Sequence, residues 1–139
     1  MLQKFYLDTA IRRDYFEDRK DGIRPLGEFA FQFLKTCQKN KCKVLFSDLV
    51  VEELKSDYSD ERISELFLPF EDVLVKVFLS DEQISESRKI SSSVKETHFK
   101  DALHAVLARD NKAVMITRDR HFEALTGVVE IAMPEDIHF

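Results

Sequence analysis

FYLD at residues 5–8 places three hydrophobic residues directly before a carboxylate. A short apolar run of this kind predicts a buried β-strand. Farther along the chain, VLF at 44–46 and AVMI at 113–116 have the same character, and the runs 73–78 and 128–132 predict two further strands. The sequence therefore predicts five strands, of which the run at 5–8 is the first.

Helical patterns lie between these apolar runs. Pro25 opens the clearest of them, because proline is favoured at the first position of a helix. The residues after it repeat at the spacing of one helical face: Leu26, Phe29, Ala30, Phe33, Leu34 and Cys37. The Ser-Asp pair at 47–48 can cap the next helix, and further helices are predicted over 60–68, 81–98 and 99–109.

The order of these elements indicates the fold class. Strands alternate with helices along the whole chain, which is typical of a parallel sheet covered by helices on both faces. The 139 residues, 44% of them hydrophobic, are enough for one domain with its own core. We therefore expect a single domain over residues 1–139, with a three-layer α/β/α fold around a mainly parallel, five-stranded sheet.

Composition excludes several classes of binding site. Gly22, Gly27 and Gly127 are the only glycines, and they lie too far apart for a Walker loop or a dinucleotide-binding glycine motif. Cys37 and Cys42 alone cannot complete a zinc site, and they favour a reduced, cytoplasmic protein. A net charge of −5 gives the chain no overall attraction for nucleic acid, so nucleic-acid binding requires bound cations or a local basic patch.

Neither a membrane span nor a secretory leader is expected. No apolar run approaches the roughly 18 residues that a membrane-spanning helix needs. Charged residues begin at Lys4, which leaves no room for the apolar core of a signal peptide. These features also favour the cytoplasm.

Four carboxylates fall at comparable places on the expected fold. Asp8 ends the first strand and Asp119 follows the fourth. Glu53 lies in the first turns of the helix after the second strand, and Asp101 lies near the start of the helix at 99–109. Strand ends and helix starts share one edge of a parallel α/β sheet, the edge where such folds bind ligands. Clustered carboxylates repel one another and oxygen ligands suit Mg²⁺ or Mn²⁺, so we expect a divalent metal site there.

Four sequence blocks carry a resemblance to a known family. They are FYLDTA at 5–10, SDLVVEEL at 47–54, FKDALHAVLA at 99–108 and MITRDRHF at 115–122. In order and spacing they resemble the four blocks of PIN-domain nucleases, and the resemblance covers essentially the whole chain. Family members of this size are often VapC-like toxins of toxin–antitoxin pairs.

The resemblance implies an activity, a cofactor and partners. It implies an endoribonuclease dependent on Mg²⁺ or Mn²⁺ that hydrolyses phosphodiester bonds of single-stranded RNA, pairs with an antitoxin protein and forms a twofold homodimer. The residues that match the acidic catalytic and metal-binding positions of the family are Asp8, Glu53, Asp101 and Asp119. Thr9 and Thr117 match hydroxyl positions that support the site.

Two positions depart from the family pattern. Ala10 stands where the family often has Asn, which removes a hydrogen bond expected near the metal. The segment 112–114 stands where many members have an Ala-Asp pair, a change expected to affect local structure only. The alternative function is therefore a PIN-fold module that binds RNA or protein with weak or no nuclease activity. A haloacid-dehalogenase-like phosphotransferase is disfavoured, because it needs a second aspartate where this chain has Ala10.

Several of these acidic side chains also have a simpler structural interpretation. Asp101 could be a favourable charge near a helix start, and Asp119 could cap a short helix over 121–125. Glu52 competes with Glu53 for the role on the helix after the second strand. The family pattern favours Glu53, because it places the acid directly before the leucine of that block.

Basic and imidazole side chains near the four blocks complete the predictions. We expect His104 to be a hydrogen-bonded core residue rather than a catalytic base, because its helix is apolar on nearly all sides. His98 and His121 are expected on the solvated surface near the site. The candidates for RNA phosphate contacts flank the proposed ligands in the sequence: Arg12, Arg13, Arg118 and Arg120.

Overall fold

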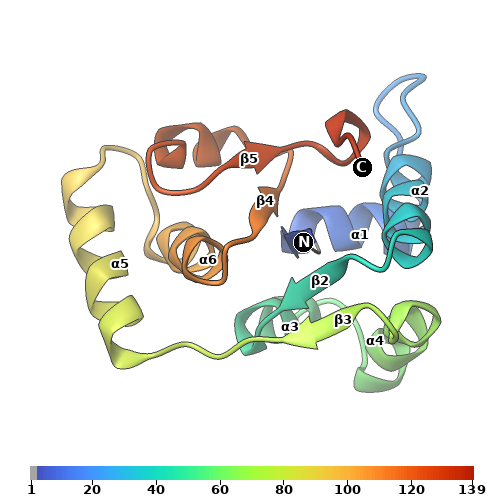
Figure 1. Cartoon of the computed structure of the whole chain (residues 1–139), viewed down its shortest axis with the longest axis horizontal. Helices are drawn as coiled ribbons and strands as arrows, with labels where there is room; N and C mark the ends of the chain where they lie inside the picture. Colours follow the sequence, from blue (N-terminus) through green and yellow to red (C-terminus); the bar gives the residue numbers. More distant parts are fainter. Residues whose placement is uncertain (1–2) are drawn as a thin grey trace.

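A five-stranded sheet organises the chain in the computed structural model, which describes residues 3–139 (Figure 1). The strand order is β3-β2-β1-β4-β5, and every neighbouring pair is parallel. The strands are β1 (Lys4–Leu7), β2 (Lys43–Phe46), β3 (Leu74–Lys76), β4 (Val114–Ile116) and β5 (Ile131–Ala132). The predicted five-stranded parallel sheet is confirmed.

The strand order reverses direction at the centre of the sheet. From β1 the chain proceeds outward through β2 to β3, and then it crosses back to place β4 on the other side of β1. Leu7 of β1 pairs with Ile116 of β4, so the two strands end together. A crevice beyond the carboxyl ends of two such strands is where open parallel sheets bind ligands.

Helices cover both faces of the sheet. They are α1 (Thr9–Glu17), α2 (Leu26–Lys39), α3 (Asp48–Lys55), α4 (Asp60–Phe67), α5 (Asp81–Ser93) and α6 (Phe99–Asp110). Three short 3₁₀ helices complete the chain: η1 (Leu68–Phe70), η2 (Arg120–Leu125) and η3 (Pro134–Asp136). In Figure 1, α1 and α2 lie to one side of the sheet and α6 lies to the other, with α5 packed outside α6. The predicted three-layer α/β/α architecture is confirmed.

The core is divided between the two faces of the sheet. On β1, Phe5 and Leu7 pack with residues of α1 and α2, whereas Tyr6 between them packs with residues of α6. This alternation follows from the geometry of a strand, whose successive side chains point to opposite faces. Since both faces are covered, Phe5, Tyr6 and Leu7 are buried in an unbroken run, as the sequence suggested.

Helix α2 shows the apolar face predicted after Pro25. Ala30, Phe33, Leu34 and Cys37 are buried. Gly27 permits the close approach of α2 to the end of α1, because a Cβ atom at this position would lie 2.6 Å from the Asp18 Cα atom. Among the described residues, no helix is both long and apolar enough to span a membrane.

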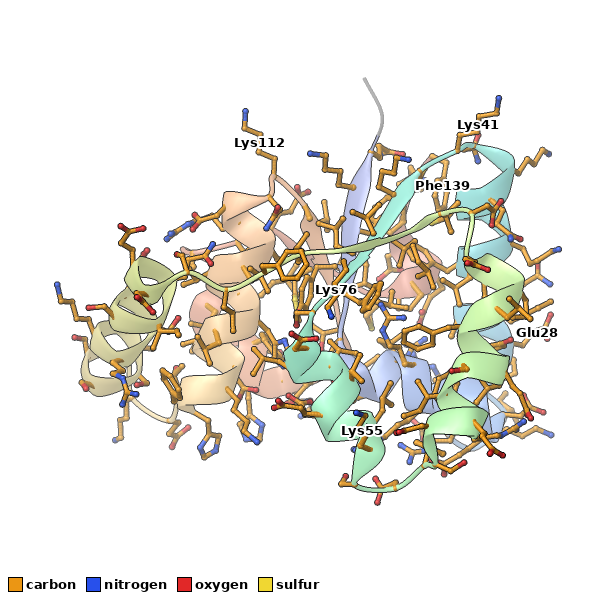
Figure 2. The ribbon with its side chains drawn as sticks, turned by 90° about the horizontal axis from the view of Figure 1, so that it is seen from below. Glu28, Lys41, Lys55, Lys76, Lys112 and Phe139 are labelled. Atoms are coloured by element: carbon orange, nitrogen blue, oxygen red, sulfur yellow. The ribbon has the colours of Figure 1, made fainter. Side chains whose placement is uncertain are left out.

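Figure 2 distinguishes the two ends of the sheet. Lys41 and Lys112, which come shortly before β2 and β4, project from one end of the molecule. Lys55, at the last position of α3, projects from the opposite end. The acidic residues of the sequence blocks lie toward this second end, beyond the points where the strands finish.

Candidate functional site

Asp8 follows β1 directly and is 7% exposed. Its carboxylate accepts a hydrogen bond of 2.8 Å from the Thr117 hydroxyl, and that hydroxyl accepts one of 3.0 Å from the Asp119 backbone N–H. Burial raises the pKa of Asp8; the charges of Glu53 and Asp119 act in the same direction, while the Thr117 bond and His104 oppose them. Thr117 thus connects Asp8 to Asp119.

Glu53 projects from α3, and its side chain is 25% exposed. Its Oε1 atom lies 2.7 Å from His104 Nε2. Burial would raise the pKa of Glu53, but the hydrogen bond and charge of His104 outweigh it and leave that pKa lowered. Glu53 is therefore held in its ionised form by a buried imidazole.

His104 extends the contact from Glu53 into the core. Its Nδ1 atom lies 2.7 Å from the Tyr6 hydroxyl, which in turn lies 2.7 Å from Ser47 Oγ. Tyr6, Ser47 and His104 are at most 2% exposed. Because Ser47 Oγ bonds to Tyr6, this serine stands at the N-cap of α3 without a side-chain capping bond.

Asp119 and Asp101 occupy helix starts, as their simpler interpretations predicted. Asp119 caps η2 by accepting a 2.9 Å bond from the His121 N–H, and its Oδ1 atom also lies 2.8 Å from His121 Nδ1. Asp101 lies in the first turn of α6. Burial and the charge of Asp119 raise the pKa of Asp101.

A pocket of about 490 Å³ brings three of the predicted residues together. Glu53, Asp101 and Asp119 line it, and Asp8 lies buried within electrostatic reach of both Glu53 and Asp119. Glu52 also lines this pocket, but its side chain is exposed. The expectation that four carboxylates gather at one edge of the sheet agrees with this arrangement.

The basic and imidazole side chains that line the pocket include one that was not predicted from the sequence. They are Arg13, Lys100, His98 and His121. The two imidazole rings pack edge to face with their centroids 5.8 Å apart. Lys100 was not among the predicted phosphate contacts, although its position directly before Asp101 in the sequence could have suggested it.

The pocket residues offer oxygen ligands but no complete metal-binding group. Within residues 3–139, no three His, Cys, Asp or Glu side chains converge on a point where they could hold a metal ion. Two of the carboxylates already have partners, since Glu53 has one oxygen on His104 and Asp119 has one on His121. Thr9 is 3% exposed, and its hydroxyl near Glu53 helps to lower the pKa of that carboxyl.

Arg12 and Arg13 have different environments in the structure. Arg12 is 4% exposed, donates a 3.2 Å bond to the Leu45 carbonyl and lies over the Phe67 ring. Arg13 lines the pocket, but it donates to the Glu53 carbonyl at 2.9 Å and pairs with Asp57 at 3.0 Å. The structure therefore brings Arg13 to the site, whereas Arg12 is buried away from any phosphate at the surface.

Arg118 points away from the pocket. It forms a two-pronged contact of 2.6 Å with Glu135 and lies 3.6 Å from Asp14. Its side chain is only 15% exposed. Arg120 is exposed and lines a neighbouring hollow of about 330 Å³ that also contains Asp119. These ion pairs occupy the Arg118 side chain, which disfavours the phosphate contact predicted for it. Arg120 remains accessible to a phosphate.

Comparisons with known proteins address the fold. No protein-family model and no curated protein match the sequence. Among solved structures, the chain is similar to a chain in the crystal structure of VapBC2 from Rickettsia felis bound to a DNA fragment from their promoter. The TM-score is 0.70 at 15% identity, covering 94% of this chain and 98% of that chain.

The fold is PIN-like. At this low identity the similarity concerns architecture, and it confirms the fold that the four sequence blocks implied. The same acidic edge of that PIN-like sheet carries Asp8, Glu53, Asp101 and Asp119, which is where the blocks placed them.

Proposed function

We propose that this chain is an endoribonuclease, dependent on Mg²⁺ or Mn²⁺, that hydrolyses phosphodiester bonds of single-stranded RNA. The observation that supports this most strongly is the arrangement of Glu53, Asp101 and Asp119 around one pocket, next to the buried carboxylate of Asp8. Burial raises the pKa of Asp8, and the charges of Glu53 and Asp119 add to that effect, so a cation at this edge would stabilise the ionised carboxylates.

The donor set suits a hard divalent cation. Asp8, Glu53, Asp101 and Asp119 supply carboxylate oxygens, the ligand type that Mg²⁺ and Mn²⁺ prefer. When bound, the metal would supply charge stabilisation at the phosphate and a more acidic water. Glu53 has one oxygen on His104 and Asp119 has one on His121, so each would offer its second carboxylate oxygen to the ion.

Other residues would position the RNA. Lys100 is exposed at the rim of the pocket, and Arg13 lies within it with its side chain held by Asp57. Both can contact phosphate oxygens, and neither requires the protein to be basic overall. His121 also lies at the pocket and is more than half exposed, so its imidazole can contact a phosphate oxygen.

The alternative is a binding module that retains the fold with weak or no cleavage. The contacts of Glu53 with His104 and of Asp119 with His121 favour it, since both carboxylates already have a partner. Ala10, which lacks the expected amide near the metal, favours it as well. This alternative predicts RNA or protein binding that is indifferent to divalent cations.

Cleavage of a labelled, unstructured RNA with Mn²⁺, and separately with chelator, distinguishes the two functions. We expect metal-dependent cleavage that falls by about 100-fold or more in Asp8→Asn and in Asp101→Asn, because each removes an oxygen ligand. Glu52→Gln is the matched control, since it removes an exposed carboxylate from the same pocket and should leave cleavage unchanged. Cleavage by Asp8→Asn at the wild-type rate would contradict the proposal.

The antitoxin and the homodimer also belong to this proposal. The similarity to VapBC2 supports a protein partner, encoded beside this chain. Co-expression with the protein of the neighbouring reading frame, followed by size-exclusion chromatography, tests the pair. Sedimentation of the isolated chain at micromolar concentration tests the dimer, and a monomer throughout would contradict it.

A further inference from the structure

A continuous set of buried hydrogen bonds runs inward from Glu53. The Glu53 Oε1 atom lies 2.7 Å from His104 Nε2, and a carboxylate oxygen accepts the proton of that ring nitrogen. His104 Nδ1 lies 2.7 Å from the Tyr6 hydroxyl, which lies 2.7 Å from Ser47 Oγ. Both ring nitrogens of the buried imidazole therefore have a partner.

The chain of bonds ends at the pocket rather than in the core. Its inner members, Tyr6, Ser47 and His104, are almost fully buried, while the Glu53 side chain is 25% exposed and lines the pocket. A backbone carbonyl would have been enough to satisfy a buried imidazole. Instead, the imidazole is joined to the side chain of a proposed metal ligand.

We propose that His104 and Tyr6 are positioning residues for Glu53. They hold the Oε1 atom and leave the second carboxylate oxygen directed toward the pocket, ready for a divalent cation. This inference rests on the proposed function, because it concerns the same metal site. Hydrogen-bonded partners of this kind orient metal ligands, and their loss weakens metal binding.

Titration of the full chain with Mn²⁺ by calorimetry tests the inference. We expect His104→Leu to weaken Mn²⁺ affinity by about 10- to 100-fold. Tyr6→Phe, which removes only the hydroxyl, should weaken it by a smaller factor. His104→Gln should recover part of the loss, because its side-chain amide can donate a hydrogen bond from nearly the position of Nε2.

Val106→Ala separates positioning from folding. Val106 lies on the same helix and is fully buried, and its apolar side chain can take no part in the hydrogen bonds. This control should lower the melting temperature and leave Mn²⁺ affinity unchanged. If His104→Leu does not fold, the effect of Tyr6→Phe on affinity decides the outcome.

The outcomes separate this inference from the proposed function. A wild-type chain that binds no Mn²⁺ overturns both. A wild type that binds Mn²⁺, with Tyr6→Phe and His104→Leu binding it equally well or more tightly, overturns the positioning role alone. Weakened binding in both variants with full affinity in Val106→Ala supports it.

Discussion

Charged residues have different surroundings on the two sides of Asp119. On the α3 and α6 side, carboxylates and imidazoles surround an open pocket, and Lys100 faces solvent. On the η3 side, Arg118 is bound to Glu135 and Asp14, and Arg24 also pairs with Glu135. A charged residue that neighbours a site residue in the sequence, as Arg118 neighbours Asp119, can therefore have its ion-pair partners within the fold and none in the pocket.

Removing Arg118 should produce the largest effect on stability. Arg118→Ala removes the shorter cation contact of Glu135 and of the buried Asp14 and leaves only Arg24 at 3.2 Å and Arg19 at 3.9 Å, which should cost about 2–3 kcal/mol of unfolding free energy. Urea denaturation measures this change. Arg120→Ala is the control, since Arg120 is exposed, and its effect should stay within about 0.5 kcal/mol. Equal stability of the two variants would show that the Arg118 pairs are unimportant.

On the pocket side, replacing the Asp8 carboxylate with an uncharged amide should stabilise the protein. Burial raises the pKa of Asp8 above its ordinary value of 3.8, so the folded state favours the protonated form and loses stability as pH rises through the folded pKa. In chelator, Asp8→Asn should therefore raise the melting temperature at neutral pH and reduce this pH dependence. A lower melting temperature at neutral pH would contradict this prediction.

Glu135 should respond with the opposite sign. Burial would raise its pKa, but the Arg118 hydrogen bonds outweigh it and leave the pKa below the ordinary value of 4.5. The ionised carboxylate therefore stabilises the fold above that value, and the contribution is lost as pH falls through the folded pKa. Glu135→Gln should lower the melting temperature at neutral pH and have little effect in strong acid. The same loss at both pH values would indicate a packing effect instead.

The smallest predicted effect concerns RNA affinity. Lys100→Glu should weaken binding of single-stranded RNA and reduce the slope of log affinity against log salt by about 0.7, because one phosphate contact is lost. Filter binding over a range of salt concentrations measures it. Lys112→Glu is the matched control, because Figure 2 places Lys112 at the opposite end of the sheet. Equal effects of both substitutions would mean that RNA approaches without preference for the pocket.

The sequence was sufficient for the sheet and for the positions of the acidic residues. Apolar runs such as 5–8 and 113–116 specify buried strands, and their order along the chain specifies the edge at which Asp8 and Asp119 emerge. These features depend on local pattern and on general rules of parallel sheets. They could be predicted without knowledge of any individual contact.

The partners of the charged side chains could not be predicted in the same way. Arg12 and Arg118 resembled surface cations, but each finds its contacts in residues far away in the sequence, at Leu45 and Glu135 respectively. His104 was correctly predicted as a core residue, yet its bond to Glu53 spans 51 positions. Such pairings depend on side-chain directions that periodicity does not determine.

The single hydroxyl of Thr117 has a consequence for how the protein is made. It bonds to Asp8, 109 positions earlier in the chain, and the Asp119 backbone bonds to it in turn. A ribosome therefore releases Asp8 long before the residues that complete its surroundings. During synthesis the acidic edge stays unassembled until β4 has emerged and docked beside β1. A nascent chain therefore has no complete acidic site while it is still close to the RNA that encodes it.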